Sequence, residues 1–152
     1  MIKIISESFN IESEFEKIAN STSGAYSFFL GTVRSDILAD QREINGVFLE
    51  CYEDLAYQQL SQIRLKAIER WKLNGCVIIH RVGNLAVGEK IVLVLTSSNH
   101  RDDAIKSCEF IIDNLKIDAA FWKFNVIGSE QIPIQAKEKD KKKFLTWKDV
   151  VN

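Results

Sequence analysis

The chain lacks an excess of charge of either sign and lacks any long apolar run. Its 152 residues carry 20 basic and 21 acidic side chains, which gives a formal net charge of −1. This balance gives no reason to expect a nucleic-acid backbone or an anionic membrane as a partner. The apolar runs are too short to span a bilayer, and the N-terminus has no cationic stretch followed by a long apolar one. We therefore expect no membrane segment and no secretory signal, and we predict a cytoplasmic location.

Cysteine is scarce, and the usual signatures of a bound metal or cofactor are missing. Cys51, Cys76 and Cys108 are odd in number, lack the spacing of metal ligands and lie within apolar patterns. We predict buried, reduced thiols rather than catalytic or disulfide-bonded groups. The sequence contains no serine triad, no phosphate-cradling glycine loop and no metal-ligand constellation. We expect neither a metal nor a cofactor.

What is present is a mixture of strand and helix patterns over the length of one domain. No internal repeat or linker divides residues 1–152, which are long enough to bury a core. The strand 91–97 is apolar on both faces and is therefore expected at the centre of a sheet. Without a regular strand–helix–strand rhythm, the pattern predicts an α+β fold with a mixed, largely antiparallel sheet and about three helices. The expected strands are 2–6, 25–33, 46–52, 76–82, 91–97 and 119–126, and the expected helices are about 11–19, 56–71 and 101–115.

The C-terminal segment turns polar from about residue 127. It contains Pro133, the only proline of the chain, and the lysine-rich run 137–143. A run of mixed charges of this kind is most simply a solvated segment. We therefore predict a polar tail, which could also reach the pocket of a neighbouring subunit.

Basic side chains recur where the expected strands and helices end. Arg34 closes a strand, His100 and Arg101 open a helix, Lys116 ends that helix and Lys123 lies on the next strand. If these ends converge, they form a cationic pocket suited to an anionic small molecule and to acyl or proton-transfer chemistry. We expect all five side chains to share one cleft.

Each of these groups also has a purely structural interpretation. The start of a helix favours a phosphate group, but Arg101 could instead pair with a neighbouring aspartate while His100 caps the helix. The two lysines lie near aromatic surface, where a lowered pKa would allow base or nucleophile chemistry, or where their stems could simply cover apolar atoms. His80 alternates with Cys76 and Ile78, so we interpret it as a satisfied structural histidine.

Taken together, the motifs resemble those of the large, catalytic subunit of molybdopterin synthase. The similarity covers roughly residues 24 to 126 in unbroken order, and ordered agreement of many short motifs is more specific than any one of them. The matching segments are Gly24-Ala25, Phe29, Gly31-Thr32-Val33-Arg34, Leu49-Glu50-Cys51-Tyr52-Glu53, Ile79-His80-Arg81-Val82-Gly83, Leu85, Val87-Gly88-Glu89, Ser97, His100-Arg101-Asp102-Asp103-Ala104, Cys108, Asp113, Leu115-Lys116 and Phe121-Trp122-Lys123.

The resemblance implies an α+β fold of the hammerhead kind and a homodimer at the centre of a heterotetramer. Each large subunit would accept the Gly-Gly C-terminus of a small ubiquitin-like subunit, which carries sulfur as a thiocarboxylate. As a sulfurtransferase, it would convert cyclic pyranopterin monophosphate into the dithiolene of molybdopterin, in molybdenum cofactor biosynthesis. Carried over by motif, Arg34, His100 and Arg101 would bind substrate, and Lys116 and Lys123 would be the catalytic lysines. Lys116 is expected to be the chemical centre, with Lys123 holding the tail or an oxyanion.

The chain departs from the family pattern around the second lysine and in the tail. Ala119-Ala120 stands where the family has Ala-Pro, and Phe124-Asn125 follows where a basic residue and a glutamate are common. The lost proline is expected to relax the loop that sets Lys123 relative to Lys116. Lys137 is the nearest match to a tail arginine that reaches a partner subunit's pocket.

Two other functions compete with the enzyme. The first is a non-catalytic module that binds the tail of a ubiquitin-like protein, but tail binding alone would not require all five basic site residues. The second is an anion-binding protein without catalysis, which leaves the Phe121-Trp122-Lys123 segment unexplained.

Overall fold

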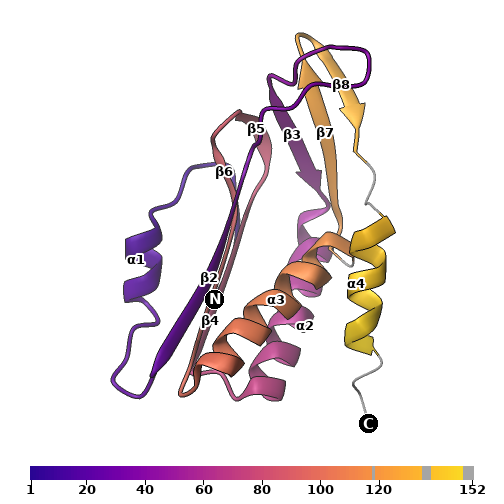
Figure 1. The fold of residues 1–152 in the computed structure, drawn as a ribbon. Coiled ribbons are helices and arrows are strands. Elements are labelled where there is room, and N and C mark those ends of the chain that lie inside the picture. Colours follow the sequence, from indigo (N-terminus) through magenta and orange to yellow (C-terminus); the bar gives the residue numbers. More distant parts are fainter. Residues whose placement is uncertain (118, 135–137, 149–152) are drawn as a thin grey trace.

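The computed structural model describes residues 1–117, 119–134 and 138–148. Over these residues the chain forms two four-stranded sheets and four helices, with α2 and α3 packed side by side (Figure 1). The elements are β1 Ile2–Ile5, α1 Ile11–Glu16, β2 Ala25–Thr32, β3 Gly46–Cys51, α2 Glu53–Trp71, β4 Gly75–Arg81, β5 Gly83–Ala86, β6 Lys90–Ser98, α3 Arg101–Ile117, β7 Phe121–Ile127, β8 Glu130–Pro133 and α4 Glu138–Lys148.

The first sheet has the strand order β1-β4-β6-β2, with β1 parallel to β4 and the other pairs antiparallel. Its central strand β6 buries Leu93 and Leu95 on one face and Val94 on the other, where α2 and α3 cover it. The predictions of an α+β fold with largely antiparallel pairing and of a central strand covered on both sides are confirmed.

The second sheet, β5-β3-β7-β8, is antiparallel throughout and was not predicted as a separate layer. The strands expected in one sheet divide between two, because β3 pairs with β5 and β7, and the chain passes from β4 into β5 at Gly83, where φ is +91°. Gly83 and Asn84, expected as a turn, instead begin the strand β5, which pairs with β3. A strand this short, with Gly83 and Asn84 in it, has little β propensity, so it is its pairing with β3 that forms it.

Within the predicted polar tail, residues 138–148 form the helix α4, which packs on α3, while Glu138 and the three lysines 141–143 are exposed. Phe144 is buried, and Trp147 donates a hydrogen bond to Asp113 Oδ2 at 2.9 Å. Lys143 forms an ion pair with Glu109 at 2.7 Å. Phe144 and Trp147 lie three residues apart and share a helix face, so they form an apolar stripe by which α4 packs against α3.

The cysteines are free thiols, as expected, and two of them are deeply buried. Burial raises the pKa of Cys76 and of Cys108 to about 11. Cys51 is only half-buried, and burial followed by the Glu53 carboxylate raises its pKa as well. None of the helices in the described part of the chain is long and apolar enough to span a bilayer.

Candidate functional site

A pocket of about 400 Å³ lies where the two sheets meet the C-terminal end of α3. The second sheet contributes Phe121 and Lys123 from β7, the first sheet contributes His80 from β4, and α3 contributes Lys116. The two lysines singled out from the sequence therefore share one pocket. Among the described residues, no group of three or more His, Cys, Asp or Glu side chains is placed to hold a metal ion.

Lys123 is the more enclosed of the two lysines. It lies two residues after Phe121 on β7, so both side chains point to the pocket side of the strand while Trp122 points outward and is 51% exposed. Burial is the main cause that lowers the pKa of Lys123, and the positive charges of Arg34 and Lys116 lower it further. A larger fraction of Lys123 is therefore the neutral amine than for a lysine in water.

Lys116 lies in the last turn of α3, where its side chain is half exposed. Its Nζ atom is 3.2 Å from Asp140 Oδ1, so the ammonium group is ion-paired to α4. Asp140 lines the same pocket. The tail helix thus places a carboxylate beside a lysine of the pocket, a contact that the sequence did not reveal because the two residues are 24 positions apart.

The loop before β7 is tethered despite the missing proline. The backbone N–H of Ala120 donates a hydrogen bond to Gln59 Oε1 at 2.7 Å. Proline has no N–H group and could not make this contact. Gln59 of α2 therefore restrains this loop by a contact that the proline of the family pattern could not make.

His80 forms part of the pocket wall rather than only part of the core. Its ring stacks on Phe121 with centroids 3.8 Å apart and an interplanar angle of 18°. Its Nδ1 atom is 2.8 Å from the carbonyl oxygen of Arg81. Burial lowers the pKa of His80 to about 4, and Lys123 contributes to this shift. The interpretation as a purely structural histidine is incomplete, because His80 lies near the end of β4 and lines the pocket.

Arg34 lies just after β2 and does not line the pocket within this chain. It is exposed and forms an ion pair with Asp36. Its charge is nevertheless close enough to contribute to the lowered pKa of Lys123. Gly31 lets β2 approach β6 closely, since a Cβ there would lie 2.7 Å from Val92 Cγ1.

His100 and Arg101 lie at the opposite end of α3 from Lys116 (Figure 1). At 1.5 Å per residue, Arg101 is about 22 Å from Lys116 along the helix. Both residues are exposed, and Arg101 makes an ion pair of 3.8 Å with Asp102. The prediction that all five basic side chains share one cleft is therefore wrong for a single chain. Lys137 lies outside the described residues.

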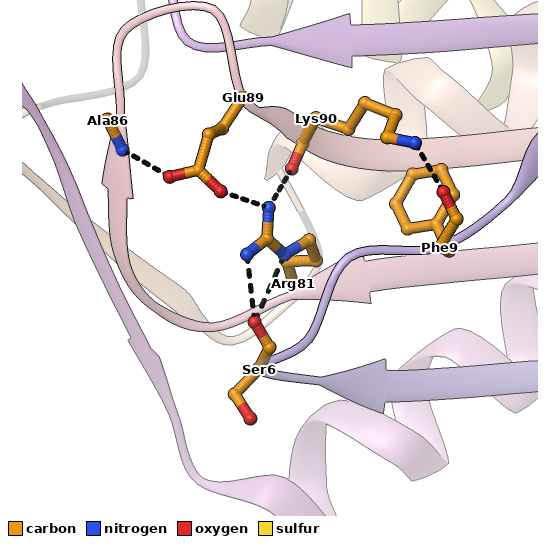
Figure 2. A network of polar contacts seen from close by, with 6 residues as sticks. All are labelled: Ser6, Phe9, Arg81, Ala86, Glu89 and Lys90. Atoms are coloured by element: carbon orange, nitrogen blue, oxygen red, sulfur yellow. Dashed lines mark hydrogen bonds and ion pairs between the residues drawn. The ribbon is translucent and has the colours of Figure 1, made fainter.

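Arg81, next to His80, is the centre of a buried polar network (Figure 2). Its guanidinium donates to the carbonyl oxygens of Ser6 and Lys90, at 2.9 and 3.0 Å, and to Glu89 Oε1 at 2.9 Å. The other carboxylate oxygen of Glu89 accepts a bond from the Ala86 N–H at 2.7 Å. One side chain thus ties the end of β4 to the loop after β1 and to the turn between β5 and β6, and it holds the backbone that carries His80.

We expect Arg81→Met to lower the free energy of unfolding by about 2–3 kcal/mol, because two backbone carbonyls would lose their buried donors. Urea titration followed by circular dichroism measures this change. Arg101→Met is the matched control, since its side chain is 88% exposed, and we expect an effect within about 0.5 kcal/mol. Equal stabilities for the two variants would contradict the role assigned to Arg81.

Comparison with known proteins shows relatives of this chain in both sequence and fold. The sequence profile of the MoaE protein family matches residues 4–118. The molybdopterin synthase catalytic subunit of Vibrio cholerae is 36% identical over 147 residues, covering 96% of this chain and 97% of its own length. The same subunit of Haemophilus influenzae is 40% identical over 124 residues, covering 82% and 81%. A solved molybdopterin biosynthesis MoaE protein from Burkholderia ambifaria superposes with a TM-score of 0.79 at 33% identity, covering 97% of each chain.

Proposed function

Because the chain belongs to the MoaE protein family, we propose that it is the catalytic subunit of a molybdopterin synthase. In this proposal it is a cytoplasmic sulfurtransferase. It takes sulfur from the thiocarboxylated Gly-Gly tail of a small ubiquitin-like subunit and transfers it to cyclic pyranopterin monophosphate, forming the dithiolene. The relatives carry the name catalytic subunit, which implies a second subunit in those proteins.

The observation that carries the proposal is the pair of lysines in one pocket. A thiocarboxylate and the oxyanion formed when it reacts are both negative, so they require a positive group at the pocket, and Lys116 is placed to supply it. Proton transfer requires a group that can exist without its proton near neutral pH, and the lowered pKa of Lys123 favours that group. This division differs from the expectation that Lys116 is the chemical centre, because Lys123 is the more buried of the two.

The proposal includes a homodimer, since the pocket of one chain lacks His100 and Arg101. The edge strand β2 exposes Phe28, and the neighbouring face of α3 exposes Ile105, at 61% and 55%. Both line a groove of about 550 Å³ that also includes Lys116. A two-fold pairing of chains along this edge would run the two α3 helices antiparallel. His100 and Arg101 of the partner subunit would then lie beside Lys116, where they could bind the substrate phosphate.

The function is tested by mixing the purified chain with a thiocarboxylated small subunit and cyclic pyranopterin monophosphate, and measuring dithiolene formation. We expect conversion only when all three are present. Tight binding of the thiocarboxylated tail without any conversion would instead support the non-catalytic module.

The shared site is tested by complementation between two inactive variants. Arg101→Ala and Lys116→Ala homodimers should each be strongly impaired. After subunit exchange, about half of the dimers are mixed and each carries one intact site, so we expect about a quarter of the wild-type activity to return. Failure to regain activity in a mixture shown to exchange subunits would contradict a site built from two chains.

A further inference from the structure

The His80 side chain lines the pocket, and one of its two ring nitrogens is bonded to the protein backbone. A carbonyl oxygen can only accept, so the 2.8 Å contact with Arg81 requires the proton on Nδ1. In this tautomer Nε2 has a lone pair and accepts hydrogen bonds. Among the described residues, none makes a hydrogen bond to Nε2. The ring is therefore an oriented acceptor with a free site.

Two contacts keep this acceptor in a fixed place. The Arg81 carbonyl holds one edge of the ring, and the Phe121 ring stacks on one face at 3.8 Å. The backbone at Arg81 is itself held by the guanidinium network to Ser6, Glu89 and Lys90 (Figure 2). Such support from surrounding groups is what fixes the geometry of a functional side chain.

The amino group of Lys123 is a donor in the same pocket, and in the structure it makes no hydrogen bond to Nε2. Phe121, on which His80 stacks, and Lys123 lie two residues apart on the same side of β7, and all three line the pocket. The other charged groups around Lys123 are two cations and one carboxylate. Lys116 on α3 and Arg34 after β2 are cations, and Asp140 on α4 is ion-paired to Lys116.

The imidazole remains neutral under ordinary conditions. Burial and the neighbouring Lys123 charge lower the pKa of His80 to about 4, so near pH 7 the ring accepts at Nε2 rather than adding a second cation to the pocket. A neutral acceptor can bind both the ammonium and the amine form of Lys123, since each has an N–H to donate.

We propose that His80 is a positioning residue for Lys123, accepting a hydrogen bond from its amino group at Nε2 and aiming that group into the pocket. Its link to catalysis rests on the proposed function, but the contact itself does not. The acceptor stabilises the ammonium form more than the amine, because hydrogen bonds to charged groups are the stronger ones. Removing it should therefore lower the pKa of Lys123 further.

The test compares variants that keep different parts of the ring. His80→Asn retains a donor near the Nδ1 position but no acceptor at Nε2. His80→Gln can place an acceptor near Nε2, and His80→Phe keeps the stacking on Phe121 without either nitrogen. Titration of the Lys123 amine, by NMR of selectively labelled lysines assigned with Lys123→Arg, needs neither substrate nor small subunit.

We expect the Asn and Phe variants to titrate Lys123 about one pH unit lower than wild type, a tenfold change in the ratio of amine to ammonium. The Gln variant should stay close to wild type. Unchanged titration in both the Asn and Phe variants would overturn the proposal. Should the Phe variant fail to fold, the Asn and Gln pair decides the question alone.

A second measurement separates this contact from the proposed reaction. In single-turnover assays the Asn variant should lose about tenfold in rate while its affinity for the small-subunit tail is unchanged, and the Gln variant should recover most of the loss. If the titration shifts as expected but no variant, wild type included, forms dithiolene, the contact stands and the proposed function fails. If the wild type is active and the Asn variant keeps its rate, the positioning role in catalysis is wrong.

Discussion

The Lys116→Ala variant is expected to form dithiolene about a thousandfold more slowly than wild type in single-turnover assays with a thiocarboxylated small subunit. Two losses combine. The pocket loses the cation that would meet the anionic tail, and Asp140 loses its partner at 3.2 Å. The unpaired carboxylate of Asp140 would then repel the thiocarboxylate at the same place.

Because Asp140 loses its ion-pair partner in Lys116→Ala, a second substitution at Asp140 serves as a control. Adding Asp140→Asn to Lys116→Ala removes the repulsion, so the double variant should be about tenfold faster than Lys116→Ala alone. Lys106→Ala removes an exposed lysine from the same helix and should leave the rate unchanged. Near-normal turnover in a correctly folded Lys116→Ala variant would show that the pocket does not need the positive charge of Lys116.

Lys123→Arg is expected to lower the single-turnover rate about a hundredfold, although it preserves the positive charge. The reason is that arginine cannot lose its proton in a protein, whereas burial lowers the pKa of Lys123 and favours the amine. If Lys123 acted only as a fixed cation, the arginine variant would retain most of its activity. High activity in Lys123→Arg would therefore contradict the proton-transfer role.

The pH dependence of the single-turnover rate follows from the lowered pKa of Lys123. The amine form of Lys123 increases as pH rises through its pKa, so the wild-type single-turnover rate should rise with pH and level off at a lower pH than for an ordinary lysine. Lys123→Arg should lose this rise, and Lys106→Arg should keep it. A pH profile identical in wild type and Lys123→Arg would assign the titrating group elsewhere.

The local elements could be predicted from the sequence because their signals are local. The two-faced apolar strand around Leu93 and Val94 indicated a central β6, and the helical spacing up to Leu115 put Lys116 at a helix end. The ordered motifs indicated the family, which the profile match to residues 4–118 confirms. They also singled out both lysines, which the structure places in one pocket.

Some of the site could not be predicted because it depends on contacts between distant segments. Nothing in a lysine-rich run shows that Asp140 will meet Lys116, since that depends on Phe144 and Trp147 docking α4 against α3. The role of Gln59 in fixing the loop before β7 depends in the same way on α2 lying beside that loop.

Apolar periodicity and motif order are properties of neighbours in the chain, so they were enough to predict the secondary structure near the centre of the fold, the family and the candidate basic residues. Which of those residues meet depends on how the elements pack. A rigid helix keeps Arg101 about 22 Å from Lys116. The crossing of two sheets brings His80 of β4 onto Phe121 of β7 and so beside Lys123. Distances between residues far apart in the sequence are set by packing and cannot be predicted from a local sequence pattern.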